Sequence, residues 1–410
     1  MWFFVFCLFW VALTTNIPIL RAFSGLGLFF IFCLFITIQS IGNVGSNTAL
    51  TQLNSVFGIS SLLFLSHMFV MTLPALNNNG MSFISNIVYL FSYSGGVFII
   101  LITLIAVNPS RTYFNVVSVF ALALGCVVFF LIIGKKFSFS NENDVRNVGT
   151  NWALLSVSIF PFVFYIKKNK VRLFLTFLVI FSAILGNKRS VIVAIALSLI
   201  FIILYFLVVD RKKIKLKYAG WTIIVVSTIF ASFVVLGDVY LSLYARMEDS
   251  VSDGGSGRVF IWLEVVKFLE SSEWLRLIIG NGPKFYYFNI NSSYSSAHND
   301  FLEIFVSYGL FGILFYIAFL SRLLYLVLFN VIRRKELAPF AISLFVVFCV
   351  MSNLSGVFIY FSNYVLLIVG IVMLEVFSKP DRKKHQRSAT TGRSSTLQDE
   401  LSARPSVSSG

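Results

Sequence analysis

Long apolar runs separated by short polar connections dominate this chain and restrict its fold more than any other feature. Each run comes near the ~20 residues that a helix needs to cross a bilayer core. Hydrocarbon offers no hydrogen-bond partner to backbone N–H and C=O groups, so runs that cross it are predicted to be helices. The sequence therefore predicts an all-α polytopic membrane protein with about 12 transmembrane helices. The predicted helices are 2–20, 22–41, 56–76, 83–107, 113–133, 152–166, 171–187, 190–209, 219–237, 299–329, 337–356 and 358–377.

Composition supports this class. Apolar residues make up 58% of the 410 residues and charged residues only 12%, about half of the share in soluble domains. All of the cysteines, Cys7, Cys33, Cys126 and Cys349, lie inside apolar runs, and no C-x-x-C pair occurs. We therefore expect free thiols, with no disulfide framework and no cysteine metal site.

The net charge of +15 would fit a nucleic-acid partner, but the distribution of the cations argues against one. Lys and Arg cluster in short loops at 167–172, 211–217 and 333–335 and in the tail after Ser378. This is the positive-inside pattern of a multi-pass protein of the bacterial inner membrane. It predicts that both termini are cytoplasmic and that the long loop 238–297 is periplasmic.

Three regions follow from this organisation. Residues 1–150 are predicted to be N-terminal transmembrane helices, and residues 151–378 form the candidate catalytic membrane region, including the periplasmic loop 238–297. Residues 379–410 are basic and rich in Ser and Thr, with too little apolar content to fold, so we expect a disordered cytoplasmic tail.

The large periplasmic loop contains an expected amphipathic helix. The stretch from Arg258 to Glu270 is mostly apolar, with polar residues three or four apart at Glu264, Lys267, Glu270 and Ser271. Such a helix is suited to lie on the outer membrane surface. Glycines precede Arg258, and Gly280-Asn281-Gly282-Pro283 indicates a tight turn further along.

Three outward-facing cationic positions break the positive-inside pattern. Lys188 and Arg189 open one predicted span, Arg258 opens the loop helix, and His298 opens another span. Lys or Arg at a helix end can simply anchor it at the interface, and Arg258 can be a solvated loop charge. The alternative is phosphate binding, since a guanidinium pairs with phosphate oxygens in two bonds and a helix N-terminus favours an anion.

His298 lies within two helical turns of Asp300 and Glu303, at the boundary of a predicted span. A lone interfacial histidine is often only a hydrogen-bonded surface residue, but ionisable groups at a membrane boundary are costly unless they are used. Histidine can serve as a general base near neutral pH. His298, Asp300, Glu303 and Glu264 all remain candidates for that role. His67, in mid-span, is interpreted as a hydrogen bond between helices.

The sequence lacks D-x-D, P-loop, H-E-x-x-H and G-x-S-x-G motifs. A soluble nucleotide-sugar enzyme or an ATPase is therefore not expected, and we predict no metal and no cofactor. A flippase or other transporter is a further alternative. Transporters place ionisable residues near the membrane midplane, whereas here they gather toward the outer face.

The chain resembles the O-antigen ligase and polymerase superfamily, which includes Wzy-type O-antigen polymerases and lipid A-core ligases. The resemblance covers roughly residues 150–375. It rests on the order and placement of four pieces, which are Asn187-Lys188-Arg189-Ser190, Gly257-Arg258 with Trp262, Gly280-Asn281-Gly282, and His298-Asn299 leading to Gly309-Leu310-Phe311-Gly312.

This resemblance implies a GT-C-like, metal-independent glycosyltransferase of lipopolysaccharide or related polysaccharide biosynthesis. Its donor would be a saccharide on undecaprenyl diphosphate at the periplasmic face, and a chain-length regulator would be a further partner. Carried over by position, Arg189, Arg258 and His298 would be catalytic, with Lys188, Glu264, Asn299, Asp300 and Glu303 as further substrate-binding candidates. A polymerase is favoured over a ligase because no evident feature would dock an anionic lipid A-core.

Overall fold

The computed structural model describes residues 67–68, 111–138, 150–186, 188–209, 258–282, 297–358 and 361–378, and every regular element in these ranges is an α-helix. The all-α fold class is therefore confirmed for this part of the chain. The predicted runs 2–20, 22–41, 83–107 and 219–237, and most of 56–76, lie outside it. The helices are α8 (Arg111–Ser138), α10 (Thr150–Val163), α11 (Asn169–Leu185), α12 (Arg189–Val208), α15 (Arg258–Ser271), α16 (Trp274–Ile279), α17 (Asp300–Arg333), α18 (Ala338–Leu354) and α19 (Phe361–Ser378).

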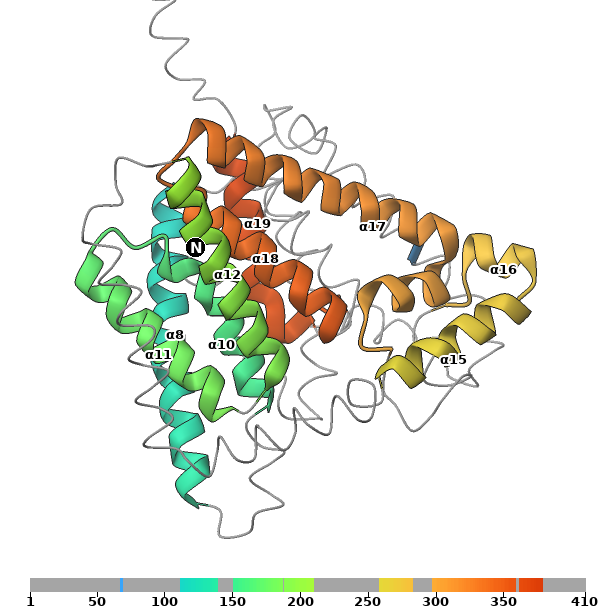
Figure 1. Cartoon of the computed structure of the whole chain (residues 1–410), viewed down its shortest axis with the longest axis horizontal. Coiled ribbons are helices and arrows are strands. Elements are labelled where there is room, and N and C mark those ends of the chain that lie inside the picture. The colour runs from blue at the N-terminus through green and yellow to red at the C-terminus, as the bar shows by residue number, and fades with distance from the viewer. Residues whose placement is uncertain are drawn as a thin grey trace, which may run out of the picture.

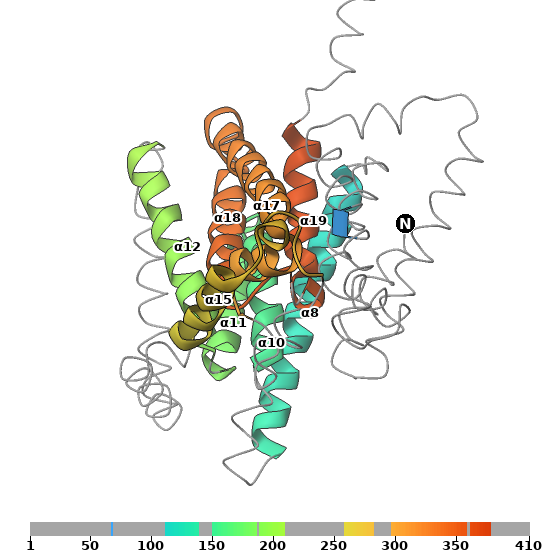
Figure 2. The same ribbon diagram turned by 90° about the vertical axis from the view of Figure 1, so that its right-hand side faces the viewer.

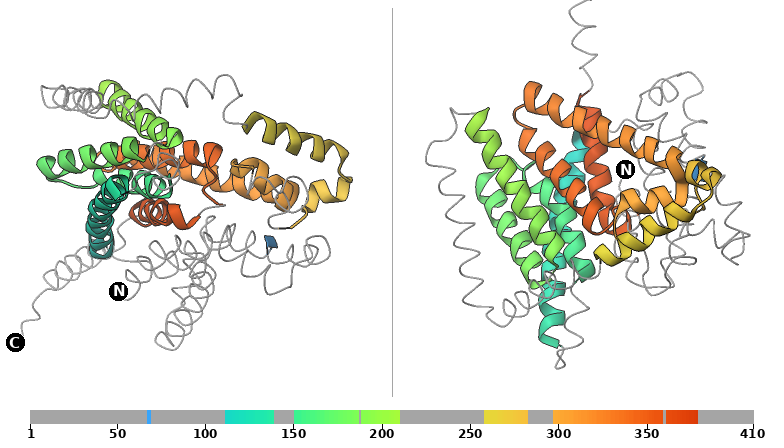
Figure 3. Two further views of the ribbon diagram at one scale, coloured as in Figure 1. Left: turned by 90° about the horizontal axis from the view of Figure 1, so that it is seen from below. Right: turned by 45° about the vertical axis from the view of Figure 1, so that its right-hand side comes forward.

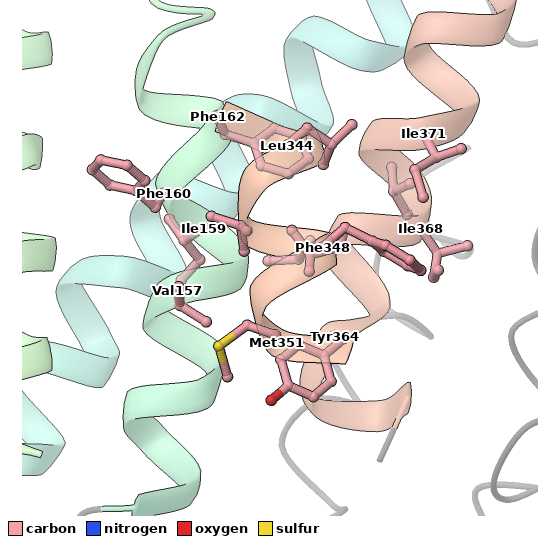
Figure 4. Packing of buried hydrophobic residues seen from close by; sticks show 14 of the residues in the cluster. Val157, Ile159, Phe160, Phe162, Leu344, Phe348, Met351, Tyr364, Ile368 and Ile371 are labelled. Carbon is pink, nitrogen blue, oxygen red and sulfur yellow. The ribbon is translucent and has the colours of Figure 1, made fainter. Parts of the chain in front are cut away.

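Helix α10 lies at the centre of the bundle, packed against α8, α11, α18 and α19 (Figure 1). Every residue from Ala153 to Phe164 is buried, because this helix is apolar on all sides and has no polar face to turn outward. Pro161 lies in its last turn, and the helix ends two residues later. Figure 4 shows Phe162 of α10 beside Leu344 of α18, whereas Phe160 points to the other side of α10 and Phe348 of α18 points toward α19.

Helices α12 and α17 are long and apolar enough to cross a membrane. The 20 residues of α12 reach roughly 30 Å, the thickness of a bilayer core. One side of α12 packs along α18. The other side exposes large aliphatic and aromatic residues, among them Ile200, Phe201, Leu204 and Val208, as expected for contact with lipid.

Helix α17 is broken at Gly309, where the sequence predicted one continuous span over 299–329. Gly309 has φ 64° and ψ −161°, so the stretch from Asp300 to Tyr308 runs in a different direction from the rest (Figure 1). The break leaves backbone carbonyl groups without a partner inside the helix, and they accept hydrogen bonds from other segments. Asn281 N donates to the Val306 carbonyl at 3.2 Å, and Gly282 N donates to the Ser307 carbonyl at 2.8 Å.

His67 also bonds at this break. Its Nε2 lies 3.0 Å from the carbonyl oxygen of Tyr308, in agreement with the predicted hydrogen bond between helices. The turn at Gly280 packs so closely here that a Cβ added to Gly280 would lie 2.5 Å from the Ser307 carbonyl oxygen. The break in α17 thus attaches the segment carrying α15 and α16 to a membrane helix.

The predicted loop helix is present as α15, beside the N-terminal part of α17 (Figure 3). Ile261 and Val265 are its buried residues, and they pack against Ala297 and Val306. The opposite side is less polar than the expected amphipathic pattern. It exposes Lys267 and Glu270 but also the apolar residues Val259, Phe260, Leu263 and Val266.

A charged pair that the sequence analysis did not single out lies between two of the predicted spans. Arg322 of α17 donates hydrogen bonds to both carboxylate oxygens of Glu375 of α19, among them Nη2 to Oε1 at 2.8 Å and Nε to Oε2 at 3.1 Å. Its guanidinium carbon also lies 4.9 Å from the centre of the Tyr325 ring. Glu375 is only 3% exposed and Arg322 is 26% exposed, so this pair links α17 to α19 with its carboxylate buried.

Candidate functional site

The cationic residues singled out in the sequence occupy the starts of three helices. Lys188 is the N-cap of α12 and Arg189 its first residue, Arg258 is the first residue of α15, and His298 directly precedes Asn299, the N-cap of α17. Figures 1 and 2 show that α12 and α15 begin at the same end of the bundle, where α18 ends and α19 begins. All four side chains are half-buried.

The electrostatics of these residues show that the fold brings them together. Burial and the positive charge of Arg258 lower the pKa of Lys188 to about 8. Burial and the charges of Arg258 and Lys188 lower the pKa of His298 to about 4. The pKa of Arg258 is lowered by burial and by Arg189, while Tyr364 acts in the opposite direction. Segments far apart in the sequence thus create one region of concentrated positive charge.

Positive charge held in a partly buried place is unfavourable unless an anion compensates it. Arg189 and Arg258 also lie at helix N-termini, where the helix dipole favours negative charge. The arrangement therefore suits an anion with several oxygens, such as a phosphate or a diphosphate. With a pKa of about 4, His298 is a neutral imidazole at neutral pH and a weak base, and an anion bound beside it would raise that pKa and its basicity.

His298 itself adopts a left-handed backbone conformation with φ 52°, and hydrogen bonds on either side hold it there. On one side, Ala297 N donates to Glu303 Oε2 at 2.9 Å, and Trp262 Nε1 of α15 donates to the Ala297 carbonyl at 3.1 Å. On the other, Asn299 Oδ1 caps α17 by accepting from Leu302 N at 3.1 Å. A bulky residue at positive φ is uncommon and strained, and such strain often marks a functional position.

The two carboxylates beside His298 bond to the protein itself. Asp300 is fully buried, and its carboxylate accepts from Ser352 Oγ at 2.7 Å, from Val357 N at 2.8 Å and from Phe358 N at 3.1 Å. Glu303 is 8% exposed and accepts from Ala297 N. Glu264, the remaining acidic candidate, lies six residues beyond Arg258 on α15, about 9 Å along the helix axis.

Two kinds of residue near the site escaped the sequence analysis. Tyr364 of α19 is fully buried and affects the pKa of Arg258; Figure 4 shows it beside Met351. Ser352 and Ser355 lie at the end of α18 and bond to Asp300 and to Ser190. All three lie near the ends of apolar runs, where serine and tyrosine carry no distinctive signal until the fold shows their neighbours.

Over the residues that the structure describes, the fold and the site define a helical protein with two helices long and apolar enough to cross a membrane and a cluster of cationic residues near their starts. Residues 174–317 match the family model described as O-antigen ligase, a range that contains Lys188, Arg189, Arg258 and His298. No curated protein matches the chain. The family match confirms the predicted resemblance to the O-antigen ligase and polymerase superfamily over residues 174–317. This superfamily consists of bacterial integral membrane enzymes of the glycosyltransferase kind that act on lipid-linked saccharides.

Proposed function

We propose that this protein is a periplasmic-face glycosyltransferase that polymerises undecaprenyl-diphosphate-linked oligosaccharide units into O-antigen or a related surface polysaccharide. The observation that carries the proposal is the gathering of Lys188, Arg189, Arg258 and His298 from three segments of the chain. Lys188 and Arg189 lie at the start of α12 and His298 at the start of α17, and both helices are long and apolar enough to cross a membrane. Such a position would suit a diphosphate that a polyprenyl chain holds at headgroup depth.

The chemistry of the proposed reaction matches the charges of the site. An acceptor hydroxyl attacks the sugar carbon of the donor, the bond from that carbon to the diphosphate breaks, and the lipid diphosphate leaves with added negative charge. Arg189, Arg258 and Lys188 stabilise that charge in a partly dehydrated place, where electrostatic interactions are strong. His298 accepts the proton of the attacking hydroxyl as general base.

His298 is favoured over the acidic candidates because of their surroundings. The Asp300 carboxylate is fully buried and accepts hydrogen bonds from Ser352, Val357 and Phe358. Glu303 accepts from Ala297 in the turn that carries His298. We assign both carboxylates, together with Asn299, the task of holding His298 in place.

Transfer of a finished polysaccharide to lipid A-core is the second candidate, since the matched family is described as O-antigen ligase. Both reactions use the same donor and leaving group, so the cluster serves either. The two differ in the acceptor. Lipopolysaccharide banding in a deletion strain separates them, because loss of a polymerase leaves core with a single repeat unit. Loss of a ligase leaves bare core and accumulated lipid-linked polymer.

Purified protein in lipid nanodiscs offers the direct test. We expect it to lengthen a saccharide on undecaprenyl diphosphate and to bind undecaprenyl diphosphate more tightly than undecaprenyl monophosphate. Equal affinity for the two lipids, together with no transfer of any lipid-linked saccharide, would overturn the proposal.

A further inference from the structure

The turn between α18 and α19 contacts both helices that carry the charged cluster. It begins at Ser352, in the last turn of α18, and reaches Phe358. Gly356 has φ 76° and donates its N–H to the Met351 carbonyl at 2.9 Å, which closes the end of α18. This left-handed glycine directs the chain so that the next two N–H groups, of Val357 and Phe358, point at Asp300.

One side of the turn is bonded to α17. Both oxygens of the Asp300 carboxylate accept hydrogen bonds, Oδ2 from Ser352 Oγ and Val357 N and Oδ1 from Phe358 N. Ser352 Oγ is also hydrogen-bonded to the Tyr316 hydroxyl further along α17. Asp300 is two residues from His298, so any shift of this carboxylate moves the start of α17 and with it the imidazole.

The other side of the turn is bonded to α12. Ser355 Oγ lies 3.1 Å from Ser190 Oγ, and both serines are buried, with 4% and 3% exposure. Ser190 directly follows Arg189, so the same turn contacts the start of the helix that carries this guanidinium. Arg189 and His298, which are more than a hundred residues apart, thus share one short connecting element.

We propose that Asp300 is a positioning residue: through the turn from Ser352 to Phe358 it sets where His298 lies relative to Arg189. This inference rests on the proposed function, in which His298 accepts a proton while Arg189 holds the diphosphate. The acceptor hydroxyl and the leaving diphosphate must both be held in line with the sugar carbon. A displacement of about 1 Å can reduce a rate about 10²-fold.

The substitution Asp300→Asn tests this role because it keeps the size of the side chain and replaces one acceptor oxygen by a donor. That donor faces N–H and O–H groups already directed at the carboxylate, so the turn must move away. In nanodiscs we expect kcat to fall about 10²-fold, with KM for the lipid-linked donor changed by less than about twofold. The affinity for undecaprenyl diphosphate should be unchanged, since the arginines remain.

A second pair of variants tests the same contact with a smaller change, in case Asp300→Asn fails to fold. Ser352→Ala removes one hydrogen bond to Asp300, whereas Ser343→Ala removes a hydroxyl from the other end of α18 that is equally buried and has no hydrogen-bond partner among the described residues. We expect Ser352→Ala to lower kcat about 5- to 10-fold, the effect of losing roughly one hydrogen bond. Ser343→Ala should match the wild type.

The link to α12 is tested by loss and restoration. Ser190→Ala should lower kcat in the same way as Ser352→Ala. The double substitution Ser190→Cys and Ser355→Cys replaces the hydroxyl contact by a pair that can form a disulfide, since sulfurs need only approach to about 2.05 Å. The oxidised double variant should regain the wild-type kcat.

Three results would overturn the positioning role. The first is an unchanged kcat per folded molecule in Asp300→Asn and Ser352→Ala. The second is a loss of undecaprenyl diphosphate binding as large as the loss of kcat, which would indicate general damage to the site. The third is equal loss in Ser343→Ala. Absence of donor binding and transfer in the wild type would instead refute the proposed function.

Discussion

Glu303 and Ala297 are joined by a hydrogen bond of 2.9 Å, from the buried backbone N–H of Ala297 to Oε2 of Glu303. It closes a short ring of chain around His298, in which Glu303 N also donates to the Asn299 carbonyl at 3.0 Å. A side chain from the first turn of α17 thus reaches back to the residue before the histidine, as in a capping box. The ring holds His298 at its positive φ of 52°.

Replacing Glu303 should therefore loosen the histidine. Glu303→Ala leaves the buried Ala297 N–H without this acceptor, which costs about 1–3 kcal/mol of unfolding free energy. Glu303→Gln keeps an acceptor oxygen and should keep most of both stability and transfer activity. Thermal unfolding and transfer assays check this, with Glu270→Gln on the exposed side of α15 as control. Equal stability of Glu303→Ala and the wild type would contradict the role of the ring.

The charged cluster should be required for transfer but not for membrane insertion. We expect Arg189→Ala, Arg258→Ala and His298→Ala each to lower glycan extension by about 10²-fold or more, as removal of groups that stabilise developing charge does elsewhere. Arg258→Lys should also be impaired, since an ammonium lacks the forked geometry of a guanidinium.

The matched control for these variants is Arg276→Ala in α16. Arg276 is exposed and has an ion pair of 3.9 Å with Glu273, the kind of surface pair that contributes little. Polysaccharide banding in a complemented deletion strain and the level of protein in the membrane are the two measurements. Wild-type banding in the Arg189 and Arg258 variants would refute the site.

Donor binding should weaken as the pH rises through about 8. The pKa of Lys188 is lowered to about 8 by burial and by Arg258, so in the free protein this amine loses its proton above that pH. A bound diphosphate attracts the ammonium and raises that pKa, so the protonated form binds more tightly and binding takes up protons near pH 8. His298, whose pKa is about 4, stays neutral over this range.

Calorimetric titration with undecaprenyl diphosphate in two buffers of different ionisation enthalpy measures this proton uptake. In Lys188→Met the affinity for undecaprenyl diphosphate should be lower overall, and its fall near pH 8 should be absent. If the affinity of that variant still fell near pH 8, another group would be responsible.

The break in α17 should tolerate no side chain at Gly309. A Cβ there would lie 2.4 Å from the Ile278 carbonyl oxygen, and its φ of 64° is unfavourable for other residues. Gly309→Ala should lower the unfolding free energy by about 1–3 kcal/mol, the cost of such backbone strain, and reduce transfer by displacing α16 and the Gly280 turn.

Gly125→Ala is the comparison for this substitution. Gly125 lies within α8, and a Cβ there would be 3.5 Å from Ile159 Cγ2, an ordinary contact. Alanine at such a helical position should be neutral or stabilise by about 0.5–1 kcal/mol. If Gly309→Ala were as stable as Gly125→Ala, the close approach of the loop to the break would be wrong.

The charged pair of Arg322 and Glu375 should show strong coupling. Arg322→Leu leaves the buried Glu375 carboxylate without its partner and should cost about 3–5 kcal/mol of stability, whereas Glu375→Leu leaves a guanidinium that is 26% exposed and should cost less. The double leucine variant should recover most of that loss, because it leaves no isolated charge. Reversible unfolding of the three variants gives the coupling energy, and additive losses would mean that the two side chains act separately.

Much of the bundle could be predicted from the sequence because apolar length is a local property. The runs at 113–133, 152–166, 171–187, 190–209, 337–356 and 358–377 all contain a helix. The run at 299–329 is helical too, but its break could not be foreseen. Gly309 alone does not break a helix; the carbonyls it frees are satisfied by Asn281, Gly282 and His67, which come from distant parts of the chain.

The candidate site divides in a similar way. Arg189, Arg258 and His298 were recognisable because a cation at the outer end of an apolar run is costly and therefore conspicuous. The sequence suggested Asp300 and Glu303 as general-base or substrate-binding candidates. In the structure Asp300 accepts hydrogen bonds from Ser352, Val357 and Phe358, and Glu303 accepts one from Ala297. The hydrogen-bond partners of a buried carboxylate depend on how the helices pack. They cannot be predicted from the residues next to it in the sequence.

The amino-acid sequence by itself determined that this chain forms helices, that some of them are long and apolar enough for a membrane, and which cations lie at helix starts, since hydrophobicity and charge act residue by residue. Only the tertiary structure decided that these cations meet, and that one turn after α18 contacts the helices of both Arg189 and His298. Such relations depend on hydrogen bonds between segments more than fifty residues apart, which form only once the helices have packed.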